Sequence, residues 1–138
     1  MAWLFYALAS AVTAAATAIL AKVGVEGVPS TLATAFRTTI VLIIAWALVL
    51  AFGERQALMA MPRRSWIFLS WSGVATGLSW LAYFRALQLG PASRVAPIDK
   101  LSLPLTIVLA AFVLGESITW KVGVGVAMMT AGALLTIL

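Results

Sequence analysis

The feature that most constrains this chain is a series of five apolar stretches, each about 20 residues long, which occupy most of its 138 residues. A helix rises about 1.5 Å per residue, so about 20 residues are needed to cross the roughly 30 Å hydrocarbon core of a bilayer. The stretches lie at about residues 3–21, 31–52, 66–89, 93–114 and 120–138. This pattern predicts an all-α integral membrane protein with five transmembrane helices in a single domain over residues 1–138.

The composition excludes a soluble domain. Hydrophobic residues make up 64% of the chain and charged residues 9%, whereas soluble domains carry about 25% charged residues. The segments between the stretches are short and hold glycine, proline and charges, as in Gly53-Glu54-Arg55 and Gly90-Pro91. Sequential helices are therefore expected to be antiparallel neighbours.

The first stretch has no cationic start and is long enough to span, so we expect it to be retained rather than cleaved as a signal peptide.

The residue types that most enzymes use for catalysis are scarce. The chain contains no His, no Cys and only four acidic residues, so the commonest general base, the thiol nucleophile and most metal-ligand sets are missing. No motif of a serine hydrolase, a zinc protease or a phosphate-binding loop occurs. We predict no enzymatic activity, no metal and no cofactor. The net charge of +5 favours anchoring at anionic lipid headgroups over nucleic-acid binding.

Four ionisable residues lie within the predicted spans, where a charge is costly and usually serves a function. Arg37 lies about 9 Å into the second stretch, Asp99 and Lys100 are similarly deep in the fourth, and Arg85 is about one turn from the end of the third. All four belong near one membrane face, and their charges favour an anionic or zwitterionic ligand. Asp99 is the candidate for a proton or cation site. The structural alternative is that Arg85 and Lys100 snorkel, and that Asp99 pairs with Arg85, Arg37 or Lys100.

Prolines and aromatic residues accompany these charges. Pro97 and Pro104 bracket the charged pair of the fourth stretch and predict helix kinks, which membrane helices tolerate where backbone is buried or lines a cavity. Trp80 lies too deep in the third stretch for the interfacial belt. Together with Tyr83 it is a candidate to line a substrate cavity; contact with lipid or with neighbouring helices is the alternative.

Small residues are spaced for close helix packing in two stretches. Gly73 and Gly77 are four residues apart in the third stretch, as are Gly123 and Ala127 in the fifth, where Gly132 follows. Such spacing lets helix backbones approach closely in lipid, although it also arises by chance in spans rich in Ala and Gly. The fifth stretch is therefore a candidate packing or dimer element.

Alternation of the spans divides the basic residues almost evenly between the two membrane faces. The first face receives Arg55, Arg63, Arg64 and Lys121, and the second receives Lys22, Arg94, Arg37, Arg85 and Lys100. Because Lys/Arg asymmetry orients membrane proteins, so weak a bias is compatible with insertion in both orientations and an antiparallel dimer. A single orientation with the first face in the cytoplasm is the alternative.

The C-terminal half carries a family resemblance. The segments Phe84-Arg85-Ala86-Leu87, Pro104, Leu114-Gly115-Glu116, Gly123 and Gly132 resemble, in order and spacing, the repeat unit of EamA-type transporters of the drug/metabolite transporter superfamily. The N-terminal half fits the unit more loosely. The resemblance implies a helical transporter of small metabolites that does not hydrolyse ATP. Members usually carry two such units of opposite orientation, whereas this chain has one.

These observations together predict that the chain is one of the two repeat units of a transporter and that a second copy of the chain supplies the other unit. Inverted repeats form their substrate site at the interface near the bilayer midplane, so we expect a homodimer, antiparallel if the chain has dual topology. The expected partners are a small-molecule substrate and membrane lipid, and the expected location is a bacterial or archaeal cell (inner) membrane. Two alternatives stay open: a structural or regulatory subunit that needs a different partner chain, and a lipid-flipping protein.

Overall fold

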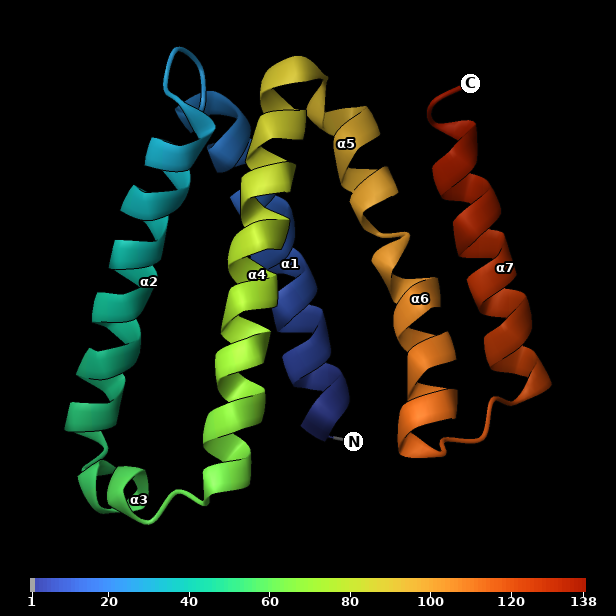
Figure 1. The fold of residues 1–138 in the computed structure, drawn as a ribbon. Coiled ribbons are helices and arrows are strands. Elements are labelled where there is room, and N and C mark those ends of the chain that lie inside the picture. The colour runs from blue at the N-terminus through green and yellow to red at the C-terminus, as the bar shows by residue number, and fades with distance from the viewer. Residues whose placement is uncertain (1) are drawn as a thin grey trace. The chain divides into compact units, whose positions relative to one another are not determined.

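The computed structural model describes residues 2–138, without the side chain of Arg55, and every regular element within them is a helix (Figure 1). Four segments are long and apolar enough to cross a bilayer: α1 (Ala2–Gly24), α2 (Ser30–Ala51), α4 (Arg63–Leu89) and the segment Ala92–Leu114. A fifth apolar helix, α7 (Trp120–Leu135), is shorter. The predicted all-α membrane class is confirmed.

Large apolar side chains face outward along these helices. Phe5, Phe36, Trp71 and Phe112 each expose more than two thirds of their surface. Exposed apolar side chains of this size and number would drive a soluble protein to aggregate, whereas in a membrane they contact lipid tails.

Prolines stand immediately before three of the helices. Pro29, Pro62 and Pro91 precede α2, α4 and α5, and their carbonyl groups accept the first helical hydrogen bonds from Ala33, Trp66 and Val95. A proline has no N–H to leave unpaired at this position, and its fixed φ angle directs the chain into the helix. Because Pro62 acts in this way, α4 begins at Arg63, three residues before the expected start at Trp66.

A short helix, α3 (Arg55–Met59), joins α2 to α4 and was not anticipated from the sequence. It has only five residues, and hydrophobic periodicity cannot be recognised over so short a segment. Gly53, which precedes it, has a φ angle of +71°, a left-handed conformation that glycine adopts without steric cost. The chain therefore turns sharply at the end of α2 before α3 begins.

The fourth apolar segment is interrupted rather than continuous. It consists of α5 (Ala92–Asp99), α6 (Ser102–Leu109) and a π-helix at Ala110–Leu114. Pro104 has no N–H to donate to the carbonyl of Lys100, and Leu103 N donates to that carbonyl instead, at 3.0 Å. The helix therefore breaks at residues 100 and 101, between the two prolines. The segment ends at Gly115, whose φ of +70° again favours glycine.

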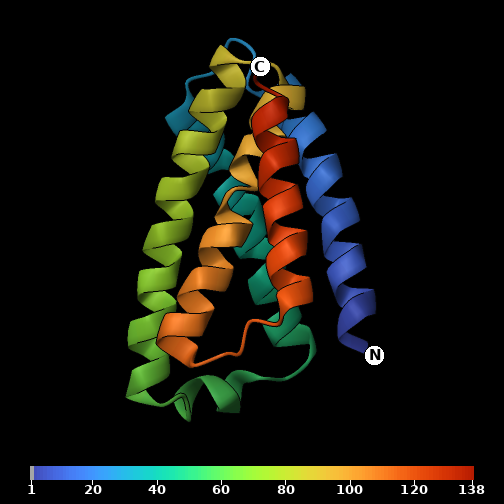
Figure 2. The same cartoon turned by 90° about the vertical axis from the view of Figure 1, so that its right-hand side faces the viewer.

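The described helices form two compact units. One comprises Leu20–Gln88, and the other comprises the residues before Leu20 together with Leu89–Leu138. In the first unit, α2 and α4 run antiparallel and α3 connects them (Figure 1). In the second, α5 and α6 both contact α7, which lies beside α6 and runs antiparallel to it (Figure 2).

Candidate functional site

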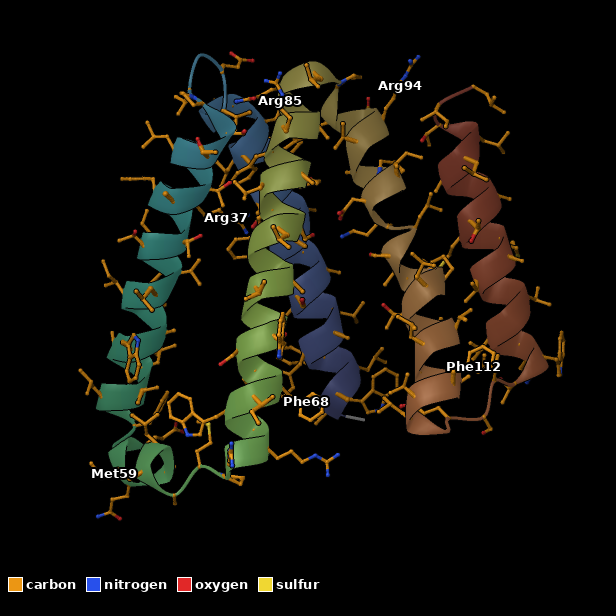
Figure 3. All side chains as sticks on the ribbon, in the orientation of Figure 1. Arg37, Met59, Phe68, Arg85, Arg94 and Phe112 are labelled. Atoms are coloured by element: carbon orange, nitrogen blue, oxygen red, sulfur yellow. The ribbon has the colours of Figure 1, made fainter. Side chains whose placement is uncertain are left out.

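Arg37 contacts two aromatic rings within the unit Leu20–Gln88. Its guanidinium carbon lies over the Trp80 ring, 4.2 Å from the ring centroid, and 5.5 Å from that of Phe84. Figure 3 shows the side chain of Arg37 extending from α2 towards α4. Arg37 and Trp80 are both half-buried. The structure thus brings together two of the residues predicted for the site, through a cation–π contact on the inner face of a helix pair.

Phe84 is the member of this group that the sequence prediction left out. It follows Trp80 by four residues, so both side chains share one face of α4. Only 2% of the surface of Phe84 is exposed. Tyr83 lies at its side, with the two ring centroids 6.4 Å apart and the rings tilted by 42°. The i, i+4 spacing of Trp80 and Phe84 was the signal that could have selected Phe84.

The buried side chains of this unit gather beside the aromatic group. Val25, Thr34, Phe84 and Leu87 are all buried, and Leu87 is wholly so. They come from the turn after α1, the start of α2 and the end of α4. Thr34 satisfies its hydroxyl group by donating to the carbonyl of Ser30 at 2.8 Å. The best-packed region of this unit therefore lies at one end of the helix pair, next to the Arg37 contact.

Hydrogen bonds from polar side chains link the end of α4 to the end of α1 and to the turn that follows α1. Lys22 Nζ donates to the carbonyl oxygen of Leu87 at 2.6 Å, and Gln88 Nε2 donates to that of Val28 at 2.5 Å. The Leu87 carbonyl is among the last of α4, and the residue four positions on is Pro91, which has no N–H to donate to it, so a cation there is favourable. Arg85 is exposed and donates to Gln88 Oε1 at 3.1 Å; Figure 3 shows it near the C-terminal end of α4. Gln88 had no place in the sequence prediction.

Asp99 and Lys100 belong to the other unit and pair with each other. Lys100 Nζ and Asp99 Oδ2 are 3.3 Å apart, with side-chain exposures of 55% and 35%. They lie where α5 ends and the chain breaks before α6. Of the three ion pairs considered for Asp99, the pair with Lys100 is present. The predicted convergence of these two residues with Arg37, Arg85, Trp80 and Tyr83 stays a prediction.

The predicted packing glycines make no close contact within their own units. A Cβ atom added to Gly73, Gly77, Gly123 or Gly132 would meet no atom of its unit within 4 Å, apart from its own helix backbone and neighbours. Ala127 is exposed as well. Helix packing at these small residues therefore remains a prediction. Within residues 2–138, no three His, Cys, Asp or Glu side chains are grouped so as to hold a metal ion.

Comparison with known proteins identifies the family. The model of the EamA-like transporter family matches residues 1–138. The chain belongs to this family. It is also 50% identical, over 133 residues, to a protein of Sinorhizobium sp described as an uncharacterized transporter in the cobO 3′ region. The matched residues cover 96% of this chain and 94% of that protein. No solved structure matches the chain.

Family membership confirms the predicted membrane class and supports the predicted transport role. The chain is a multi-pass integral membrane protein of a transporter family. The Sinorhizobium relative has nearly the same length as the matched region, so a chain with one unit is a form in which this family occurs.

Proposed function

We propose that the protein is a secondary transporter of small metabolites that works as a homodimer of oppositely inserted copies. The observation that carries this proposal is the match of the whole chain to one family unit, together with a relative of almost equal length. A transporter built from inverted repeats needs two units to form its midplane site. A second copy of the same chain supplies the missing unit without a further gene product.

The distribution of charge supports opposite insertion. With alternating spans, four basic residues fall on one membrane face and five on the other, or two if the three that are set more deeply in the spans are left out. Lys/Arg residues next to the spans act as orientation signals. A chain with little difference between its two faces inserts both ways, and the two orientations then meet as an antiparallel pair.

The substrate site of this dimer is proposed to include the charged and aromatic residues inside the spans. The six residues are Arg37, Trp80, Tyr83, Arg85, Asp99 and Lys100. Three cations and one carboxylate favour an anionic or zwitterionic substrate. The Arg37–Trp80 contact supports this assignment, because it holds a cation on an aromatic surface inside the membrane. Asp99 is proposed to carry the coupling proton or cation.

Labelling of single cysteines tests the topology. The chain has no cysteine, so Ser65→Cys and Ser93→Cys each introduce a single thiol. Ser65 lies in the first turn of α4, a helix of 27 residues that is about 40 Å long, and Ser93 follows four residues after its last residue in the sequence. Dual topology predicts that an impermeant maleimide labels each position from both sides of the membrane, to about half each time.

The opposite outcomes separate the remaining possibilities. Labelling of each position from one side alone refutes the antiparallel homodimer. A purified protein that stays monomeric and moves no solute in liposomes supports a subunit that needs a different partner chain. Lipid scrambling without flux of small solutes supports a lipid-flipping protein.

A further inference from the structure

The guanidinium of Arg37 contacts two aromatic rings, but among the described side chains of its own unit no acidic group pairs with it. The only acidic residues of Leu20–Gln88 are Glu26 and Glu54, and both lie outside the helices, against six basic residues. Among the described side chains of this unit, neither glutamate forms an ion pair. A cation about two turns into a membrane helix is costly unless an anion or water compensates it. The described side chains of its own unit therefore provide Arg37 with no anionic partner.

The hydrogen-bonding capacity of Arg37 is also unused within the unit. The contact with Trp80 places the guanidinium carbon over the ring, which offers no oxygen or nitrogen lone pair as a hydrogen-bond acceptor. No hydrogen bond within Leu20–Gln88 has the guanidinium of Arg37 as its donor, whereas Arg85 donates to Gln88. The planar guanidinium carries a fork of N–H groups suited to two oxygen atoms of one anion, and the cation–π contact holds that group at this place in the unit.

The surroundings of Arg37 match a single negative charge. Two other basic side chains at the same end of this unit are engaged elsewhere, Lys22 with the Leu87 carbonyl and Arg85 with Gln88. The rings of Trp80 and Phe84 contact Arg37, and Tyr83 interacts with it electrostatically. One guanidinium on an apolar wall neutralises one carboxylate, whereas a phosphate dianion would leave a charge uncompensated in a medium of low dielectric constant.

We infer that Arg37 binds the carboxylate of a monoanionic organic acid whose flat or apolar body lies against Trp80 and Phe84. This inference rests on the proposed transporter function, for which it specifies the substrate class as small organic monocarboxylates. An anionic lipid headgroup would present the same oxyanion chemistry to Arg37, and the experiment below distinguishes the two sources.

The chain offers a matched control for the test. Arg64 lies over the ring of Phe68, with its guanidinium carbon 5.7 Å from the centroid, but both side chains are exposed, in the first turns of α4. The substitutions Arg37→Lys and Arg64→Lys both keep the positive charge, and with it the orientation signals, while both remove the planar N–H fork. Only the first should change binding of a carboxylate.

Thermal unfolding of the purified full chain in detergent, followed by tryptophan fluorescence, measures the binding. Benzoate is the probe, benzamide is its uncharged counterpart, and inorganic phosphate and dihexanoyl phosphatidylglycerol represent the other anions. We expect benzoate, but not benzamide, to raise the Tm of the wild-type protein and of Arg64→Lys. In Arg37→Lys the apparent Kd for benzoate should rise about tenfold or more, and Trp80→Leu should also weaken binding.

Equal benzoate binding by Arg37→Lys and Arg64→Lys would overturn the inference, as would equal stabilisation by benzamide. Stabilisation through Arg37 by phosphatidylglycerol or phosphate, without stabilisation by benzoate, would overturn it in favour of a lipid headgroup or a phosphate. The unliganded Tm shows whether each variant is folded. Because binding is measured without flux, benzoate binding with no uptake in proteoliposomes would refute the transporter function alone. Uptake that is independent of Arg37 would refute the site alone.

Discussion

Replacing Gln88 by leucine removes the side chain that ties the turn after α1 to the last turn of α4. Gln88 Nε2 donates to the carbonyl of Val28 at 2.5 Å, and more weakly to that of Val25 at 3.5 Å. Leucine has a similar size and a good helix propensity, so the substitution removes hydrogen bonds without creating a large cavity. The change in stability therefore measures the contribution of the Gln88 hydrogen bonds.

The magnitude follows from these contacts. A hydrogen bond contributes about 0.5–1.5 kcal/mol net, and an acceptor left unpaired in a buried place costs about 1–3 kcal/mol. Gln88 and Val28 are half-buried, the bond to Val25 is at the limit of length, and the contact with Arg85 is exposed. We therefore expect a loss of about 1–2 kcal/mol, carried mainly by the bond to Val28.

Hydrogen exchange of the turn provides the assay. The amide of Val28 donates to the carbonyl of Val25 at 3.3 Å, so opening of the turn exposes it to exchange. A loss of 1–2 kcal/mol predicts that this amide exchanges about 5–30 times faster in Gln88→Leu than in the wild-type protein in the same detergent. The control is Gln56→Leu, because Gln56 is exposed in α3. Equal exchange in the two variants would refute the reasoning.

Three further predictions concern packing, coupling and backbone conformation. Leu87→Ala should destabilise the protein by about 2–5 kcal/mol, because Leu87 is wholly buried, whereas Leu89→Ala should have little effect because Leu89 is 73% exposed; similar midpoints in chemical denaturation would contradict this. Asp99→Asn should abolish gradient-driven uptake in proteoliposomes and leave the folded dimer intact on size-exclusion chromatography, and full transport by that variant would remove Asp99 from the mechanism. Gly115→Ala should lower stability by about 1 kcal/mol, because the φ of Gly115 is +70°, and the same change at Gly125, which has no positive φ, should not; equal shifts in Tm would exclude backbone strain as the cause.

The charged residues show how far sequence reasoning reached into the candidate site. Arg37 and Trp80 were selected because a bilayer penalises polar and interfacial side chains at depth, but nothing in the sequence indicated that they contact each other. That contact depends on the axial register and rotation of α2 against α4, which packing decides. Gln88 was not predicted because an uncharged polar residue near a helix end carries no distinctive signal. Phe84 was not predicted as a site residue because its spacing from Trp80 is equally typical of ordinary helix packing.

The interruption of the fourth span was predicted only in part from the sequence. Pro97 and Pro104 predicted that the helix would be distorted, since each removes one backbone hydrogen bond. Whether the chain bends smoothly or breaks depends on the alternative bonds that the backbone finds. Here Leu103 N donates to the Lys100 carbonyl, and the helix stops and restarts with the Asp99–Lys100 pair at the break.

The sequence by itself determined the class of this protein and the positions of its apolar segments, because the thickness and low dielectric constant of a bilayer act on length and composition, which are properties of the linear chain. The tertiary structure alone decided which side chains meet. Arg37 lies on Trp80 and Phe84, and Lys22 and Gln88 hold the end of α4, because contacts between helices depend on register, and register arises from the packing of whole side chains against one another.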